Sequence, residues 1–119
     1  MGPDTVKSLR VWQLGISVVK DIYALTNDWP KREILGITSQ IRRAAVSISA
    51  NIAEGKGRGS NAELVRFSRI ALGSAYEVDT LLEIATELGF PGCPRIADLR
   101  QRLTSLVRQL STYIQSRCA

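Results

Sequence analysis

The chain has 119 residues, of which 45% are hydrophobic and only 6% aromatic, and its formal net charge is +5. This length allows one domain with one core, and so few aromatic residues favour a core of packed helices. No apolar run reaches the ~20 residues of a membrane span. The N-terminus lacks a basic region followed by an apolar stretch, so we expect a cytoplasmic protein without signal peptide or membrane contact.

The first expected helix, residues 6–27, carries two apolar rows at helical spacing. One row consists of Leu9, Trp12, Ile16, Val19 and Tyr23. The other consists of Val11, Leu14, Val18, Ile22 and Leu25. The core of one bundle needs a single apolar stripe from each helix. We therefore predict that the row from Val11 to Leu25 forms an interface with further copies of the chain.

The second expected helix, residues 38–55, begins at Thr38 or Ser39, either of which can act as its N-cap. Before it, Pro30 can open a short helical turn. The helix ends in the segment GKGRGS at 55–60, which combines flexible glycines with two cations. This segment could hold an anion together with the next helix N-terminus, but taken alone we favour a solvated turn.

The third expected helix spans residues 60–88 and the fourth spans residues 95–117. Ser60 and Glu63 form a capping box at the start of the third, whereas Gly89 and Pro91 end it. The fourth carries a heptad seam that starts at Ile96. Because all connections are short, we predict one domain over residues 1–119. Its fold is an all-α, antiparallel up-down-up-down four-helix bundle.

The chemistry available to this bundle is limited, because the sequence contains no histidine. This removes the commonest general base at neutral pH, most zinc sites and the Glu-x-x-His pairs of di-iron bundles. We therefore expect no enzymatic activity, no cofactor and no metal. Cys93 and Cys118 form no close-spaced motif. We expect free thiols there rather than a disulfide that joins the tail to the last loop.

Polar residues lie on or beside the apolar stripes of the second and third helices. They are Arg43, Ser47, Asn51, Glu54, Ser74 and Glu77. One interpretation is a catalytic pair of carboxylates, Glu54 and Glu77. We favour a hydrogen-bond network that sets the helix register, with Arg43 as its counter-charge, because a buried carboxylate must be paired.

One end of the predicted bundle collects cations from all four helices. They are Lys7, Arg10, Lys56, Arg58, Arg66, Arg69 and Arg117, against Asp4, Glu54 and Glu63. The other half of the third helix carries only carboxylates. We predict that the basic end binds RNA or DNA through phosphates, without reading sequence, because no aromatic residues are interleaved with the cations. The alternative is a scaffold that binds another protein, with the charge serving solubility.

Four segments resemble one known family. They are LRVWQ at 9–13, QIRRAAVSI at 40–48, NIAEG at 51–55 and IALGSAYE at 70–77. The chain is similar to the four-helix-bundle proteins encoded in intervening sequences of bacterial 23S rRNA genes. It is also similar to the accessory protein of diversity-generating retroelements, which binds nucleic acid and a reverse transcriptase through basic surfaces.

This resemblance implies a bundle that assembles as a ring, typically a homopentamer with a central pore, and it implies no established enzymatic activity. The family's motif positions are occupied here by Arg42, Arg43, Ser47, Asn51, Glu54, Gly55, Gly73, Ser74 and Glu77. The sequence departs at Ser49, where proline is usual, at Trp29, where phenylalanine is common, and at Ile34 and Leu35, which replace an aromatic residue.

Overall fold

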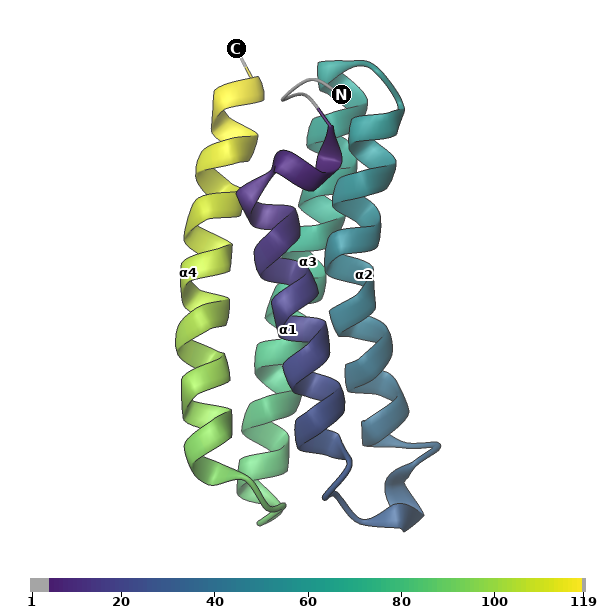
Figure 1. Ribbon diagram of the computed structural model, residues 1–119, viewed down its shortest axis with the longest axis vertical. Coiled ribbons are helices and arrows are strands. Elements are labelled where there is room, and N and C mark those ends of the chain that lie inside the picture. The colour runs from purple at the N-terminus through teal and green to yellow at the C-terminus, as the bar shows by residue number, and fades with distance from the viewer. Residues whose placement is uncertain (1–4, 119) are drawn as a thin grey trace.

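The computed structural model describes residues 5–118 and contains four long helices with no strand in that range (Figure 1). They are α1 (Arg10–Thr26), α2 (Ile37–Gly57), α3 (Asn61–Glu87) and α4 (Cys93–Arg117), with the 3-10 turns η1 (Val6–Ser8) and η2 (Lys31–Glu33). The bundle measures 44 × 23 × 22 Å. Asp4, counted above among the carboxylates of the basic end, lies outside the described residues.

The four helices run up, down, up and down around one core, as predicted. Each helix packs against its neighbour in the chain, and α4 closes against α1. Side chains from all four helices fill the core, among them Ile22, Ile48, Leu82 and Leu106, which are fully buried. Among residues 5–118, the two ends of the bundle are built from turns and helix ends.

The helix ends follow the sequence signals at most positions. The Ser60 side chain accepts a hydrogen bond from the backbone N–H of Glu63 at 3.2 Å, and Pro30 precedes η2. Gly89 adopts a left-handed conformation with φ +74°, and the Phe90 N–H donates back to the Ala85 carbonyl at 2.9 Å. Ser60 therefore caps the start of α3 and Gly89 ends it, as the capping rules require.

Two predicted helix starts were wrong. Helix α1 begins at Arg10 because Val6–Ser8 forms a separate 3-10 turn and Leu9 is extended. Helix α2 begins at Ile37 with Gly36 as its N-cap, so Thr38 lies inside the helix, where its side chain is buried. Because Thr38 and Ser39 lie inside the helix, neither occupies the N-cap position.

The assignment of the two α1 rows was also inverted. Four of the five residues predicted as an interface, Val11, Val18, Ile22 and Leu25, are at most 5% exposed in the single chain, and Leu14 is packed against the core. The row that reaches solvent is the other one, through Ile16 at 38% and Tyr23 at 43% exposure. Both rows have the same spacing, so periodicity could not tell which one faces the bundle axis.

Two of the positions where the sequence departs from the family pattern, Ser49 and Trp29, have clear structural roles, whereas Ile34 and Leu35 are exposed. Ser49 is buried and its hydroxyl donates to the Trp12 carbonyl at 3.0 Å, and α2 continues through it. Trp29 is buried edge-on against Phe90, with ring centroids 5.3 Å apart, and its indole N–H donates to the Pro91 carbonyl. Trp29 thus ties the α1–α2 connection to the α3–α4 connection.

None of the helices in residues 5–118 combines the length and the hydropathy that crossing a membrane requires. Cys93 and Cys118 are exposed free thiols. They mark the two ends of α4, whose 25 residues correspond to about 37 Å at ~1.5 Å per residue. A disulfide between these two cysteines within one chain is therefore excluded.

Candidate nucleic-acid interface

One end of the bundle brings together the start of α1, the end of α2, the start of α3 and the end of α4. Figure 1 shows the two chain ends and the α2–α3 turn at this same end. We call it the basic end and define it as residues 5–17, 48–73 and 106–118. The remaining described residues, 18–47 and 74–105, form the neutral half. All seven cations predicted to bind phosphate lie in the basic end.

The α2–α3 turn is tighter than the glycine-rich segment suggested. Helix α2 continues through Gly55, Lys56 and Gly57, so only Arg58 and Gly59 separate it from the cap Ser60. Gly59 has φ +82°, which favours glycine. A Cβ at Gly55 would lie 2.9 Å from the Phe67 Cβ, so this glycine allows α2 and α3 to approach closely. The segment is therefore a compact turn and not a flexible anion-binding loop.

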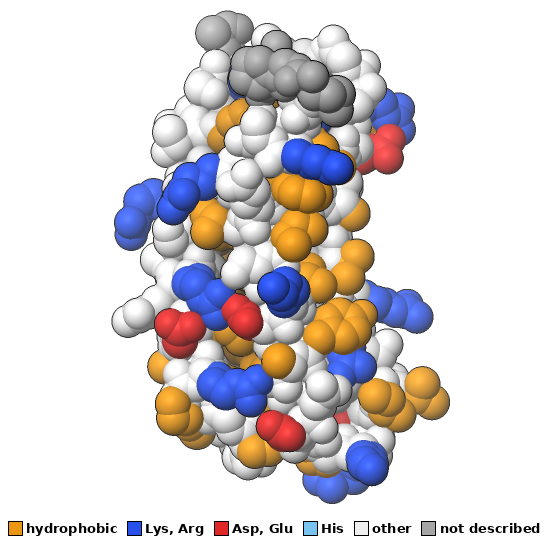
Figure 2. All heavy atoms as spheres, viewed as in Figure 1, with side chains coloured by type: hydrophobic (Ala, Val, Ile, Leu, Met, Phe, Trp, Pro, Cys, Tyr) orange, Lys and Arg blue, Asp and Glu red, His pale blue; other side chains and the backbone are white. Residues whose placement is uncertain are grey.

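Charge is divided unequally between the two halves. The basic end carries eight Lys and Arg side chains against two Glu, whereas the neutral half carries eight Lys and Arg against eight Asp and Glu. Figure 2 shows this on one face, where carboxylates are interspersed with cations in the lower half. The net positive charge of the described residues therefore lies entirely in the basic end.

Sequence reasoning missed one member of this cluster, Arg108. It lies in the middle of the α4 sequence, but in the fold it lines a groove together with Arg10 from the first turn of α1. The close packing of α4 on α1 could not be read from a single helix pattern. No signal in the sequence alone pairs these two arginines.

Two of the predicted cations are already paired. Arg58 contacts Glu54 at 2.9 Å and Arg66 contacts Glu63 at 3.1 Å, each within one helical turn. Both guanidinium groups also lie over the Phe67 ring, at 5.0 and 4.4 Å from its centroid. Such exposed pairs contribute little to stability, but they reduce the charge that these two arginines present to a ligand.

The other cations of the basic end have no carboxylate partner among the described residues. They are Lys7, Arg10, Lys56, Arg69, Arg108 and Arg117. Arg69 donates to the Cys118 sulfur at 3.7 Å, and the Arg117 guanidinium lies 5.2 Å from the Tyr113 ring centroid. Lys56 and Arg117 line a shallow hollow of about 140 Å³ beside the start of α3. These side chains form the part of the basic end that is best suited to contact phosphates.

Aromatic rings do lie among these cations, contrary to the prediction from sequence. Phe67 directly follows Arg66 in the sequence and Tyr113 lies four residues before Arg117. In the fold, these two rings are covered by Arg58, Arg66 and Arg117. Phe67 is nearly buried, whereas Tyr113 remains partly accessible. Burial raises the pKa of the Tyr113 hydroxyl, and the nearby charge of Arg117 opposes this shift. Tyr113 is therefore neutral at physiological pH.

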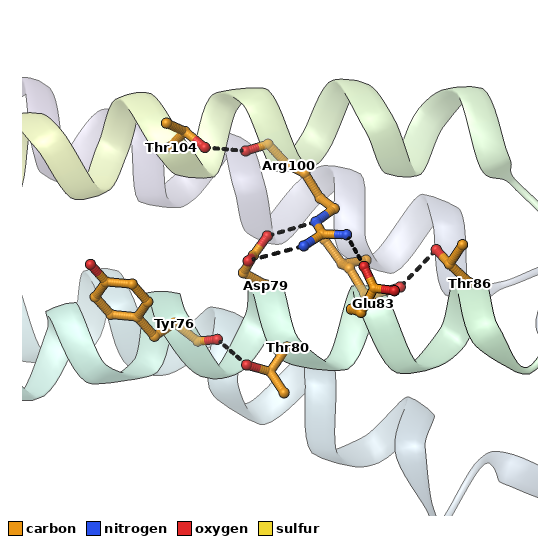
Figure 3. A network of polar contacts seen from close by, with 8 residues as sticks. Tyr76, Asp79, Thr80, Glu83, Thr86, Arg100 and Thr104 are labelled. Carbon is orange, nitrogen blue, oxygen red and sulfur yellow. Dashed lines mark hydrogen bonds and ion pairs between the residues drawn. The ribbon is translucent and has the colours of Figure 1, made fainter.

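The neutral half is held by ion pairs that join helices distant in sequence. Figure 3 shows Arg100 of α4 pointing at Asp79 and Glu83 of α3. Its Nε lies 2.8 Å from an Asp79 oxygen and its Nη1 lies 2.5 Å from Glu83. These hydrogen bonds raise the pKa of Arg100, and that from Arg100 lowers the pKa of Glu83. The acidic half of α3, which we predicted without a counter-charge, is thus neutralised from α4.

A second arginine of α4 has the same role toward α1. Arg102 contacts Asp21 of α1 and Asp98 of its own helix, and it donates to the Ser17 hydroxyl at 3.1 Å. Arg100 and Arg102 together tie α4 to both of its neighbours. Ion pairs between segments distant in sequence are therefore concentrated in the neutral half, at Arg95, Arg100 and Arg102.

The predicted polar network is smaller than expected. The Ser47 and Ser74 hydroxyls lie 2.8 Å apart across α2 and α3, and the Asn51 amide donates to the Ser47 hydroxyl at 2.8 Å. Glu54 and Glu77 are exposed, and the Glu77 carboxylate accepts from Gln40 at 3.4 Å. Arg43 is exposed and has no carboxylate partner in residues 5–118. Because the carboxylates reach solvent, they need no counter-charge, and they do not converge as a catalytic pair.

The described residues contain no group of three or more Asp, Glu, His or Cys side chains that could hold a metal ion. The fold, and the cations without carboxylate partners that gather at one end of it, define the class of protein. It is a small antiparallel four-helix bundle with one basic end. The chain belongs to the 23S rRNA-intervening sequence protein family, whose model matches residues 7–112.

A solved structure supports the fold assignment. It is a protein of unknown function from the S23 ribosomal protein family of Bacteroides thetaiotaomicron VPI-5482, similar to this chain with a TM-score of 0.80. The match covers 88% of this chain and 95% of that chain at 23% sequence identity, which shows a shared fold alone. A comparison with proteins of curated function gave no match.

Proposed function

We propose that this protein is a non-enzymatic, ring-forming bundle whose basic end binds RNA or DNA through phosphates. The observation that carries the proposal is the set of six cations without carboxylate partners, gathered from all four helices at one end. Phosphate contacts made by Lys and Arg release counterions and give affinity without base recognition. The pairing of Arg58 and Arg66 with glutamates makes them secondary members of this surface.

Self-association is the second part of the proposal, and exposed apolar side chains support it. Tyr23, Ile34 and Val46 are each more than 40% exposed and line a hollow of about 600 Å³ whose other lining residues are mostly polar residues of α2, and Ile16 of α1 is 38% exposed. Apolar groups gathered in this way are typical of interfaces. The resemblance to the family implies five chains, and a ring would multiply the basic end, which raises affinity through avidity.

The interface has a direct test. The double variant Ile16→Glu with Tyr23→Glu places two charges on the exposed row and leaves the buried row intact. We expect a helical monomer in place of the oligomer, as measured by light scattering coupled to size exclusion. The matched control is Ile84→Glu on α3, at a similar exposure of 41%. A wild-type chain that is already monomeric at high concentration would contradict this part of the proposal.

The nucleic-acid part is tested by titrating the protein with an RNA hairpin, duplex DNA and single-stranded DNA. We expect all three to bind at about 50 mM salt, and binding to weaken steeply at about 200 mM. If none of the three binds at the lower salt, the nucleic-acid proposal fails.

The second candidate function, a scaffold for another protein, is favoured by one specific feature. Leu35 in the α1–α2 connection is 92% exposed and Leu88 at the end of α3 is 61% exposed. Burial of such apolar side chains against a partner is favourable. The scaffold function would stand if the chain assembles but no polyanion binds.

A further inference from the structure

The groove between α1 and α4 in the basic end combines an apolar floor with two cations. It has a volume of about 480 Å³ and is lined by Leu9, Val11 and Tyr113, with Arg10 and Arg108 among its walls. No Asp or Glu lines it, and neither arginine has a carboxylate partner among the described residues. The groove therefore favours an occupant that is anionic on one side and apolar on the other.

We propose that this groove accepts one unpaired nucleotide of a bound strand, with the base against the apolar floor and the flanking phosphates on Arg10 and Arg108. This inference rests on the proposed function, because the rest of the strand would be held by the basic end. A flat base has an apolar face and a polar edge, and the groove matches the edge with the side chains of Gln109, Thr112 and Ser116. Its volume lies in the range of small-ligand sites.

A partner helix fits this groove less well. A docked helix needs apolar anchors repeated over two or more turns, whereas the apolar part of this floor consists of three side chains. The two guanidinium groups would also face the apolar side of such a helix. An unpaired nucleotide fits both features, because its base can cover the short apolar floor and its flanking phosphates can contact the two arginines.

The test compares three otherwise identical duplexes. One carries a single bulged adenosine, one carries an abasic site at the bulge and one is fully paired. The abasic duplex keeps the phosphates and the flexibility of the bulge but lacks the base. We expect the bulged adenosine to bind at least about fivefold more tightly than the abasic bulge, since a stacked base contributes this much or more. The series is made in RNA and repeated in DNA.

Two tryptophan variants locate the effect. Thr112→Trp fills the groove, whereas Thr104→Trp is its matched control on the same helix, outside the groove. Both threonines are exposed, and both donate to the carbonyl four residues earlier, at 3.1 and 3.0 Å. We expect Thr112→Trp to abolish the preference for the bulged base over the abasic bulge while the paired duplex still binds. Thr104→Trp should retain the preference.

A third variant, Arg108→Gln, removes one positive charge without filling the groove. It should weaken binding of the bulged duplex more than binding of the paired duplex. Equal binding of the bulged and abasic duplexes by the wild-type chain would overturn the groove proposal. So would a preference that survives in Thr112→Trp. If the paired duplex still binds after either of these results, only the groove proposal fails and the proposed function of the basic end stands. If the wild-type chain binds none of the three duplexes, both the groove proposal and the proposed function fail.

Discussion

The two halves of this bundle contain the same number of cations and use them differently. In the neutral half, Arg100 and Arg102 bridge α4 to its neighbours. In the basic end, the ion pairs are local, between residues one helical turn apart, and six cations have no carboxylate partner among the described residues. The difference teaches that the number of cations does not locate a binding surface. The excess of cations over carboxylates does, and this excess lies in the basic end.

The largest expected effect removes the excess charge of the basic end. The triple variant Arg10→Glu, Arg69→Glu and Arg117→Glu should lower the affinity for duplex DNA by on the order of a hundredfold, because each charge-assisted contact contributes about 1 kcal/mol or more. Fluorescence anisotropy measures the loss. The control reverses Lys31, Arg32 and Arg43, three exposed cations of the neutral half without carboxylate partners in residues 5–118. Equal losses in both triples would mean that the two halves do not differ in binding.

The second prediction concerns the packing that closes the basic end. Gly55→Leu would place a side chain where even a Cβ lies 2.9 Å from the Phe67 Cβ and 3.2 Å from the Leu64 Cα. We expect the free energy of unfolding to fall by about 2 kcal/mol or more from overpacking. Gly57→Ala is the control, because a Cβ there meets nothing within 4 Å, and it should be neutral or slightly stabilising. Thermal unfolding followed by circular dichroism distinguishes the two.

The third prediction tests the bridge in the neutral half. Arg100→Gln breaks the contacts to Asp79 and Glu83 and should lower the free energy of unfolding by less than Gly55→Leu does, since all three groups are partly exposed to solvent. Affinity for duplex DNA should change much less than in the Arg10, Arg69 and Arg117 triple. A large loss of binding would show that the bridge positions the basic end.

The same bridge predicts a pH dependence. The hydrogen bond from Arg100 lowers the pKa of Glu83 below its ordinary value of 4.5. A carboxyl whose pKa is lower in the folded state stabilises the fold above its unfolded pKa, and this stabilisation is lost as pH falls through the folded value. Stability should therefore decrease below about pH 4.5. The decrease should be smaller in Arg100→Gln, which removes the largest cause of the lowered Glu83 pKa. An identical pH profile in the variant would mean that other carboxyls cause the decrease.

The smallest expected effect frees the two paired arginines of the basic end. Glu54→Gln combined with Glu63→Gln releases Arg58 and Arg66, so the affinity for duplex DNA should rise by about threefold to tenfold at low salt. Glu77→Gln with Glu87→Gln makes the same change of charge in the neutral half and should give a smaller increase. If both pairs raise affinity equally, only the total charge matters.

The fold was largely predictable because its signals are local. The cap at Ser60, the left-handed Gly89 and the apolar spacing of the third and fourth helices depend on residues close in sequence. The choice between the two rows of α1 was not predictable, because both rows satisfy the same period and the difference depends on where α2 and α4 pack. A single sequence holds no signal for that placement.

The candidate site was predicted in part for the same reason. Its seven cations followed from the up-down order of the helices, which the short connections determine. The addition of Arg108 and the pairing of Arg100 with α3 depend on the rotation of each helix about its axis. Rotation is set by side-chain packing across the whole bundle.

The most direct test of the central claim is the slope of log affinity for duplex DNA against log salt concentration. With about six phosphates contacted, we predict a slope near −5 for the wild-type chain. The Arg10, Arg69 and Arg117 triple should lower its magnitude by about 3, and the Lys31, Arg32 and Arg43 triple should leave it unchanged. A slope near zero, or one that both triples change alike, would contradict the assignment of phosphate binding to the basic end.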